Sequence, residues 1–129
     1  MALTQAQVKV EITLLRRALK TLQEAVRMKQ VQIVRDGTVQ RFEYVFELSW
    51  KAMKLAAEYK GTSSNSPRDA IRVAFKLGWI KKPQEWFDAL EARNMTSHTY
   101  NRRTARRVYQ VAKKFSPLVV ELLRSLQKI

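Results

Sequence analysis

The sequence predicts an all-α protein, an antiparallel up-and-down bundle of four or five helices. Apolar residues recur every three or four positions over long stretches, whereas no strand-type alternation extends beyond a few residues. The 129 residues are 46% hydrophobic and 28% charged, a globular composition. This length is sufficient for a hydrophobic core but not for two, so we expect a single domain over residues 1–129.

The first helix is expected over about residues 4–30. Thr4 and Gln7 have the spacing of a capping box at its start. Its apolar residues are spaced 4, 3, 4, 3, 4, which is a heptad-like seam: Val8, Ile12, Leu15, Leu19, Leu22 and Val26. Residues 31–34 could be extended or helical, and Asp36-Gly37 then predicts a turn.

The second helix is expected over about residues 38–59, before a stop at Gly61. Its polar residues fall in a stripe roughly 80° wide on the helical wheel: Glu43, Glu47, Lys51, Lys54 and Glu58. Apolar residues occupy most of the remaining circumference. We therefore expect this helix to be central in the bundle or shared with a second subunit.

The third helix has a serine cap, a proline in its first turn and an early acid, at Ser66, Pro67 and Asp69. It should end at Gly78, with Trp79-Ile80 packed inward. The fourth helix begins near Pro83. The fifth runs from about residue 104 to the end, and Pro117 should kink or restart it after Ser116.

We expect the fourth helix to continue over residues 84–100. The arc of Trp86, Phe87 and Leu90 marks its core side. Further along, that side turns polar, with Arg93, Asn94, Ser97 and His98, and Tyr100 at its margin. Inward polar groups are costly unless they are paired or face a cleft or a subunit interface, which suggests a site. The alternative is a helix that ends near Tyr100 and leaves Arg93 and His98 to cap carbonyls or reach solvent.

The composition excludes several classes of site. There is no cysteine, His98 is the only histidine, and only 11 acids are present, so we expect no bound metal. No Gly-rich phosphate loop occurs. No apolar run approaches the ~18 residues of a membrane span, and the amino terminus lacks signal-peptide organisation, so a cytoplasmic protein is expected.

A net charge of +14 predicts attraction to polyanions, with nucleic acid favoured over an anionic membrane surface. Between Ala92 and Val120 there is no acid. This stretch contains seven basic residues, Arg93, Arg102, Arg103, Arg106, Arg107, Lys113 and Lys114. We expect the cluster from Arg102 to Arg107 to bind RNA phosphates. The alternative is a solvated face of the last helix.

Imidazole and guanidinium suit RNA cleavage, because RNA carries its own 2'-hydroxyl nucleophile and the reaction requires no metal or other cofactor. His98 could be the base or the acid, and Arg93 could stabilise the charged phosphoryl transition state. Asn94 could orient His98 from one helical turn away, or form only surface hydrogen bonds. One histidine per chain cannot be acid and base at once, which favours a homodimer that brings two motifs together.

The segment Arg93-Asn94-x-x-x-His98-x-Tyr100 resembles the R-x4-H-x-Y signature of the HEPN superfamily, specifically its HepT-like proteins, also called nucleotidyltransferase substrate-binding subunits. The similarity covers about residues 14–123. It includes further blocks in the same order and spacing: Gln40-Arg41-Phe42-Glu43-Tyr44, Phe46-Glu47-Leu48, Trp50-Lys51 and Ser66-Pro67-Arg68.

The resemblance implies a HEPN-like helical homodimer associated with a minimal nucleotidyltransferase. Members of the family are metal-independent endoribonuclease toxins, and the nucleotidyltransferase is an antitoxin that adenylylates the motif tyrosine. Arg93 and His98 would then be catalytic, Asn94 supporting, and Tyr100 the modified residue.

Three alternatives stay open. Tyr100 could be an aromatic side chain packed at the end of the bundle. Glu47 and Lys51 could line the cleft, although an ordinary i, i+4 ion pair is the preferred interpretation. The whole chain could be a substrate-binding subunit that performs no chemistry and presents a substrate to its partner enzyme.

Overall fold

The computed structural model describes residues 3–129; residues 1 and 2 of the predicted domain lie outside the described residues. The helices are α1 (Gln5–Arg27), α2 (Gln32–Tyr59), α3 (Pro67–Lys76), α4 (Pro83–Asn94), the 3-10 helix η1 (Thr96–His98), α5 (Arg102–Lys113) and α6 (Ser116–Leu126). No strand occurs among residues 3–129, so the all-α prediction is confirmed. In this range no helix combines the length and apolar character that a membrane crossing requires.

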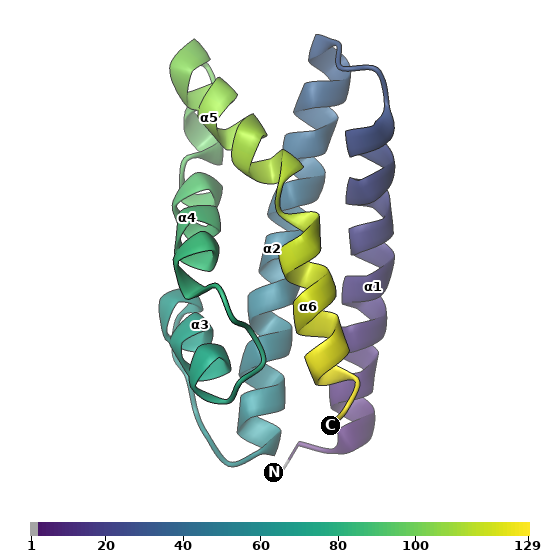
Figure 1. Ribbon diagram of the computed structural model, residues 1–129, viewed down its shortest axis with the longest axis vertical. Helices are drawn as coiled ribbons and strands as arrows, with labels where there is room; N and C mark the ends of the chain where they lie inside the picture. The colour runs from purple at the N-terminus through teal and green to yellow at the C-terminus, as the bar shows by residue number, and fades with distance from the viewer. Residues whose placement is uncertain (1–2) are drawn as a thin grey trace.

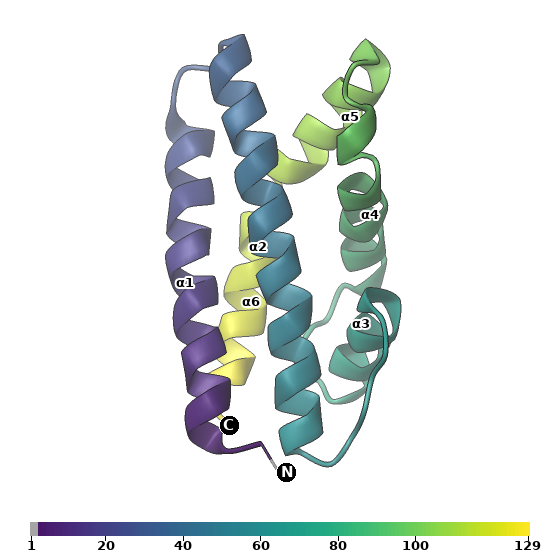
Figure 2. The same cartoon turned by 180° about the vertical axis from the view of Figure 1, so that it is seen from behind.

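The two long helices α1 and α2 lie side by side and antiparallel (Figure 1). On the other side of α2, helices α3 and α4 stand one above the other (Figure 2), whereas α5 crosses obliquely from the top of α4 toward α2 and α6 runs beside α1 and α2 (Figure 1). Helix α2 packs against all five other α-helices. Much of its broad apolar surface is therefore buried within a single chain, as expected for a central helix, while Ile33 and Tyr44 stay exposed.

Four large aromatic side chains form the centre of the core. Phe42 and Phe46 come from α2, Trp86 from α4, and Phe115 from the junction of α5 and α6; all are buried. Phe115 lies edge-on to Phe42 at 5.2 Å and to Trp86 at 5.1 Å between ring centroids. Edge-to-face contacts at this distance are favourable, so Phe115 joins three elements of the bundle.

The predicted turn at Asp36-Gly37 is wrong, because α2 already begins at Gln32 and includes both residues. The Gln32 side chain donates to Asp36 Oδ1 at 2.7 Å, one turn further along the helix. The buried Thr38 donates its hydroxyl to the carbonyl of Val34 at 2.8 Å. Glycine inside a helix costs about 1 kcal/mol relative to alanine, and these contacts and the packing of α2 offset that cost.

The helix starts predicted from capping residues are confirmed. Thr4 and Gln7 form a reciprocal capping box at the start of α1. Ser66 accepts from the backbone N–H of Asp69, and Pro67 occupies the first turn of α3. Trp79 and Ile80 are buried, as predicted.

The prediction of one helix over residues 84–100 is wrong. Helix α4 ends at Asn94, and the N–H of Met95 closes its last turn on the carbonyls of Glu91 and Ala92. The Thr96 hydroxyl donates to the carbonyl of Arg93 at 2.9 Å. Threonine competes with the backbone in this way, which favours a tighter turn over another turn of α-helix. The chain continues as η1 and then as a loop.

The predicted fifth helix is two helices, α5 and α6, separated at Lys114 and Phe115. Pro117 lies in the first turn of α6, so a restart near this proline is confirmed, although the break lies at Lys114 and Phe115 and not after Ser116 as predicted. Helix α5 begins slightly earlier than predicted, because the side chain of Asn101 accepts from the N–H groups of Arg103 and Thr104.

Candidate functional site

A groove of about 710 Å³ separates the first part of α2 from α5. The two helices diverge in this region, toward the end of the bundle where α1 turns into α2 (Figure 2). At the same end, the Tyr109 hydroxyl of α5 donates to the side chain of Gln30 in the α1–α2 connection. The groove is lined by Gln32, Arg35, Asp36, Val39, Gln40, Glu43, Thr96, Thr99, Arg102, Ala105, Arg106, Tyr109 and Gln110.

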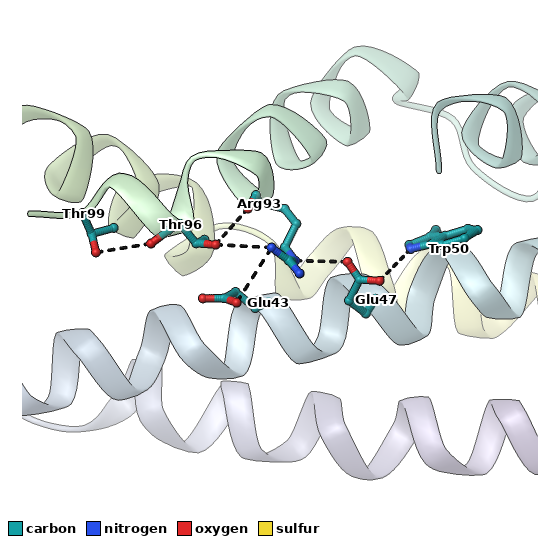
Figure 3. A network of polar contacts seen from close by, with 6 residues as sticks. All are labelled: Glu43, Glu47, Trp50, Arg93, Thr96 and Thr99. Carbon is teal, nitrogen blue, oxygen red and sulfur yellow. Dashed lines mark hydrogen bonds and ion pairs between the residues drawn. The ribbon is translucent and has the colours of Figure 1, made fainter. Parts of the chain in front are cut away.

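Arg93, at the end of α4, reaches across to α2 beside this groove (Figure 3). Its Nε donates to Glu47 Oε1 at 3.1 Å, and its Nη1 lies 3.8 Å from Glu43 Oε2. Nη1 also donates to the Thr96 hydroxyl at 3.3 Å. The second oxygen of Glu47 accepts from Trp50 Nε1 at 3.0 Å. Because both oxygens of Glu47 are held, the carboxylate and the guanidinium that it binds are fixed in orientation.

The preferred pairing of Glu47 with Lys51 is wrong. Among residues 3–129, Glu47 forms its ion pair with Arg93, and Lys51 is exposed. Two acids one turn apart on α2, Glu43 and Glu47, face an arginine in a stretch without acids of its own. That complementarity is the signal by which the contact could have been anticipated. Arg93 is therefore neutralised locally, although its own stretch of sequence is uncompensated.

His98 and Tyr100 are exposed and do not face the core, so the inward orientation of the histidine is wrong and the alternative that His98 reaches solvent is confirmed. The Tyr100 hydroxyl lies 3.5 Å from His98 Nδ1, and the two rings are edge-on at 6.0 Å between centroids. Tyr100 is 85% exposed, so the alternative of an aromatic packed at the bundle end is wrong. Both side chains are accessible to a ligand or to a partner protein.

Asn94 does not orient His98 within the described chain. Asn94 is the last residue of α4 and is exposed, whereas His98 ends the separate helix η1. No side-chain hydrogen bond joins them among residues 3–129. The i, i+4 relation predicted from a continuous helix is lost when the helix ends.

Arg93 and His98 are connected through the turn between them. Thr96 binds the guanidinium of Arg93, and the N–H of His98 donates to the carbonyl of Met95 at 3.0 Å. The described residues show no direct hydrogen bond between the guanidinium and the imidazole. The structure thus places both groups on one short segment without bringing their side chains into contact.

The four arginines predicted to bind RNA divide into two sets. Arg102 and Arg106 line the groove, whereas Arg103 and Arg107 do not. Arg107 instead lies 3.7 Å from Glu91 of α4. The opposite wall contributes Arg35 of α2, which the sequence analysis missed because it placed this residue in a connection before a turn.

The chemistry available here is anion binding and proton transfer. No group of three or more potential ligands among residues 3–129 is arranged to hold a metal ion. Guanidinium groups offer forked donors that match phosphate oxygens, and an exposed imidazole can exchange a proton with a bound substrate. The groove and the adjacent turn together form a positively charged surface with an ionisable side chain at its edge.

Comparison with known proteins shows the family of the chain. Residues 10–128 match the model of a family described as nucleotidyltransferase substrate binding protein like. A Haemophilus influenzae protein named "Probable ribonuclease HepT" is 34% identical over 107 residues, which cover 74% of this chain and 73% of that protein.

Two solved structures share the fold. A crystal structure of a Thermus thermophilus protein has a TM-score of 0.82 and 31% identity, and covers 88% of this chain and 98% of that one. The Haemophilus influenzae protein HI0074, described as revealing the fold of a substrate binding domain of a nucleotidyltransferase, has a TM-score of 0.76 and 28% identity over 90% of this chain and 98% of its own. The match of the family model over nearly the whole chain, together with the HepT relative, shows that this protein belongs to the nucleotidyltransferase substrate-binding-protein-like family.

Proposed function

We propose that the protein is a HepT-like, metal-independent endoribonuclease and the toxin of a toxin–antitoxin pair with a minimal nucleotidyltransferase. The observation that carries this proposal is an oriented guanidinium, Arg93, and an exposed imidazole, His98, on one turn beside an arginine-lined groove. The relative named as a ribonuclease and the family description support it.

In the proposed reaction a base removes the proton of the 2'-hydroxyl, and the 2'-oxygen attacks the adjacent phosphorus. The bond from phosphorus to the 5'-oxygen breaks, an acid protonates that oxygen, and a cyclic 2',3'-phosphate remains. His98 supplies one of the two proton transfers. Arg93 stabilises the charge on the phosphoryl oxygens in the transition state.

A homodimer supplies the second imidazole in this proposal. Each chain contains one histidine, so acid and base together require His98 from two copies. The exposed position of His98 permits such an approach. Tyr44 of α2 is 60% exposed and follows Glu43, one of the two acids that hold Arg93. It offers apolar area beside the site for contact with a second copy.

Modification of Tyr100 would regulate the reaction. The partner nucleotidyltransferase would present a nucleoside triphosphate, the Tyr100 oxygen would attack its α-phosphorus, and pyrophosphate would leave as the phenolic proton is lost. Because the Tyr100 hydroxyl is 3.5 Å from His98 Nδ1, the attached nucleotide would occupy space beside the imidazole. The modified protein is expected to cleave RNA poorly.

The experiment is RNA cleavage in chelator by purified wild type and by His98→Ala, with the state of Tyr100 determined by mass spectrometry. Cleavage by unmodified wild type and a loss of about 100-fold or more in His98→Ala are expected. Ser97→Ala is the matched control, since Ser97 is exposed on the same segment and has no role in the proposed reaction. Equal cleavage by wild type and His98→Ala would contradict the proposal.

The second candidate is a non-catalytic substrate-binding subunit of a two-component nucleotidyltransferase. One observation favours it: in the single chain Arg93 already has two carboxylates around its guanidinium, which reduces the positive charge available to a transition state. No cleavage by wild type whose Tyr100 is free would support this candidate over the ribonuclease.

A further inference from the structure

We infer that the groove between α2 and α5 is a binding site for one or two nucleotides of single-stranded RNA, with Arg35, Arg102 and Arg106 contacting the phosphates. The inference rests on the proposed function for its substrate class. It adds a location, a third arginine from the opposite wall and a requirement for a single strand.

The groove has arginines on both of its walls. Arg35 projects from α2, and Arg102 and Arg106 from α5; all three line the groove. None of the ion pairs among residues 3–129 involves these three side chains. By contrast, Arg93 and Arg107 each lie within ion-pair distance of a carboxylate. The groove arginines therefore keep their charge for an external anion.

The two acids in the groove already have partners. Asp36 accepts a hydrogen bond from Gln32 at 2.7 Å. Glu43 lies 3.8 Å from Arg93. Neither acid is paired with a groove arginine in the described chain, so the three guanidinium groups dominate the field that a ligand meets.

The volume fits a short single strand. Small-molecule sites typically occupy about 300–1,000 Å³, and the groove measures about 710 Å³. Proteins that recognise double-stranded RNA span about 16 base pairs over an extended surface, which a groove of this size does not provide. A single strand, whose bases are unpaired, can place individual nucleotides in a groove of this size.

The walls also offer groups suited to bases. Gln40 of α2 and Gln110 of α5 line the groove from opposite sides and are exposed. Neither side chain takes part in a hydrogen bond within residues 3–129. Each amide has an oxygen acceptor and two N–H donors, so it can pair with the edge of an unstacked base.

The groove leads to the proposed catalytic residues. Glu43 and Thr96 both line it, and both contact the guanidinium of Arg93. A strand bound along the three arginines would therefore place a neighbouring phosphate near Arg93. A second copy of this chain is less suited to the groove, because symmetric docking would bring two sets of unpaired arginines together at a net charge of +14 per chain.

The experiment measures binding of a fluorescent single-stranded RNA oligonucleotide by anisotropy between about 50 and 200 mM salt. All variants are made in the full chain with His98→Ala, so that bound RNA is not cleaved. The groove variants are Arg35→Ala and the double variant Arg102→Ala with Arg106→Ala. The matched controls are Arg41→Ala on α2 and Arg124→Ala on α6, both exposed and outside the groove.

We expect Arg35→Ala to weaken binding about fivefold and to reduce the slope of log affinity against log salt by about 0.7, the value for one phosphate contact with a single strand. The double variant should reduce the slope about twice as much as Arg35→Ala does, and the controls should change affinity less than about twofold. A duplex of the same sequence should bind more weakly than the single strand and respond less to the groove variants.

Three results would overturn the inference. The groove variants could bind like the parent, the controls could lose as much affinity as the groove variants, or light scattering could show that the groove variants change the oligomeric state. Equal loss of duplex and single-strand binding would overturn the single-strand requirement.

Failure of this inference can be distinguished from failure of the proposed function. If wild type binds RNA in the groove but never cleaves it, the ribonuclease proposal fails alone. If wild type cleaves RNA and the groove variants bind it normally, the groove assignment fails alone.

Discussion

The two ends of the R-x4-H-x-Y segment have opposite environments. Arg93 is half-buried and contacts Glu47, Glu43 and Thr96 from two elements. His98 and Tyr100 are exposed, and their side chains share one long contact of 3.5 Å. In the proposed function the guanidinium acts through a fixed fork and benefits from being held in place, whereas the imidazole that would move protons and the tyrosine that would be modified have to be reachable. One continuous motif thus combines a fixed group with two accessible ones.

The largest effect that tests this contrast is expected for Arg93→Ala. The substitution leaves Glu43 and Glu47 facing each other without their cation, so the free energy of unfolding should fall by about 1–2 kcal/mol. His98→Ala should change it by less than about 0.5 kcal/mol, because the side chain is exposed. Urea denaturation followed by circular dichroism measures the free energy of unfolding of both variants. Similar losses in the two variants would contradict the division into a fixed and an accessible half.

Asn101→Ala should have the next largest effect. Its side chain caps α5 by accepting from two backbone N–H groups, and loss of such a cap costs about 1 kcal/mol. Asn94→Ala is the control from the other end of the segment, where the asparagine is exposed, and it should cost less than about 0.5 kcal/mol. If the two asparagines prove equivalent in thermal denaturation, the loop is not fixed through the α5 cap.

Glu47→Gln should affect cleavage more than Glu43→Gln. Glu47 makes the 3.1 Å bond to Arg93 and is itself held by Trp50, whereas Glu43 lies at 3.8 Å. The glutamine amide introduced at position 47 would hold the Arg93 guanidinium less firmly than the carboxylate does, so Arg93 would be present but less well positioned. We therefore expect kcat to fall several-fold with little change in KM. Initial rates of multiple-turnover cleavage over a range of RNA concentrations measure both constants. A change confined to KM, or an equal effect of the two substitutions, would show that Glu47 does not position Arg93.

Tyr100→Phe should have the smallest effect on the folded protein. The hydroxyl is exposed, so the free energy of unfolding should change by less than about 0.5 kcal/mol. RNA cleavage should persist, while modification by the partner nucleotidyltransferase should be lost, as measured by intact mass. Modification of the Tyr100→Phe protein at the same stoichiometry would place the acceptor elsewhere, and Tyr44 would be the next exposed tyrosine to examine.

Much of the fold could be predicted because local signals and the final structure agree. Thr4 and Ser66 cap helices as expected, and a new helix begins near Pro117 as expected. In each case the deciding interaction lies within a few residues of the signal. The apolar seam of α1 is likewise buried along most of its length, because its period matches the helix.

The errors arose at two places, one where the packing of a helix outweighed a local turn signal and one where a competing local hydrogen bond ended a helix early. Gly37 resembles a turn residue, yet α2 runs through it because the packed helix and the Gln32 to Asp36 bond offset the cost of glycine. The period of α4 predicts a continuation to Tyr100, yet Thr96 bonds back to Arg93 and the helix ends. Extrapolating the wheel beyond that end placed His98 on the wrong side.

The order of residues alone was enough to establish a helical bundle, its caps and proline break, and a family motif, because these depend on spacing and on neighbours in the chain. The partners of Arg93, the exposure of His98 and Tyr100, and the division of the arginines between groove and outer surface depend on helices far apart in sequence. Glu47 and Arg93 are 46 positions apart, and only the packing of α4 against α2 brings them within 3.1 Å. Periodicity records which side of a helix is buried, but it does not record what lies opposite that side.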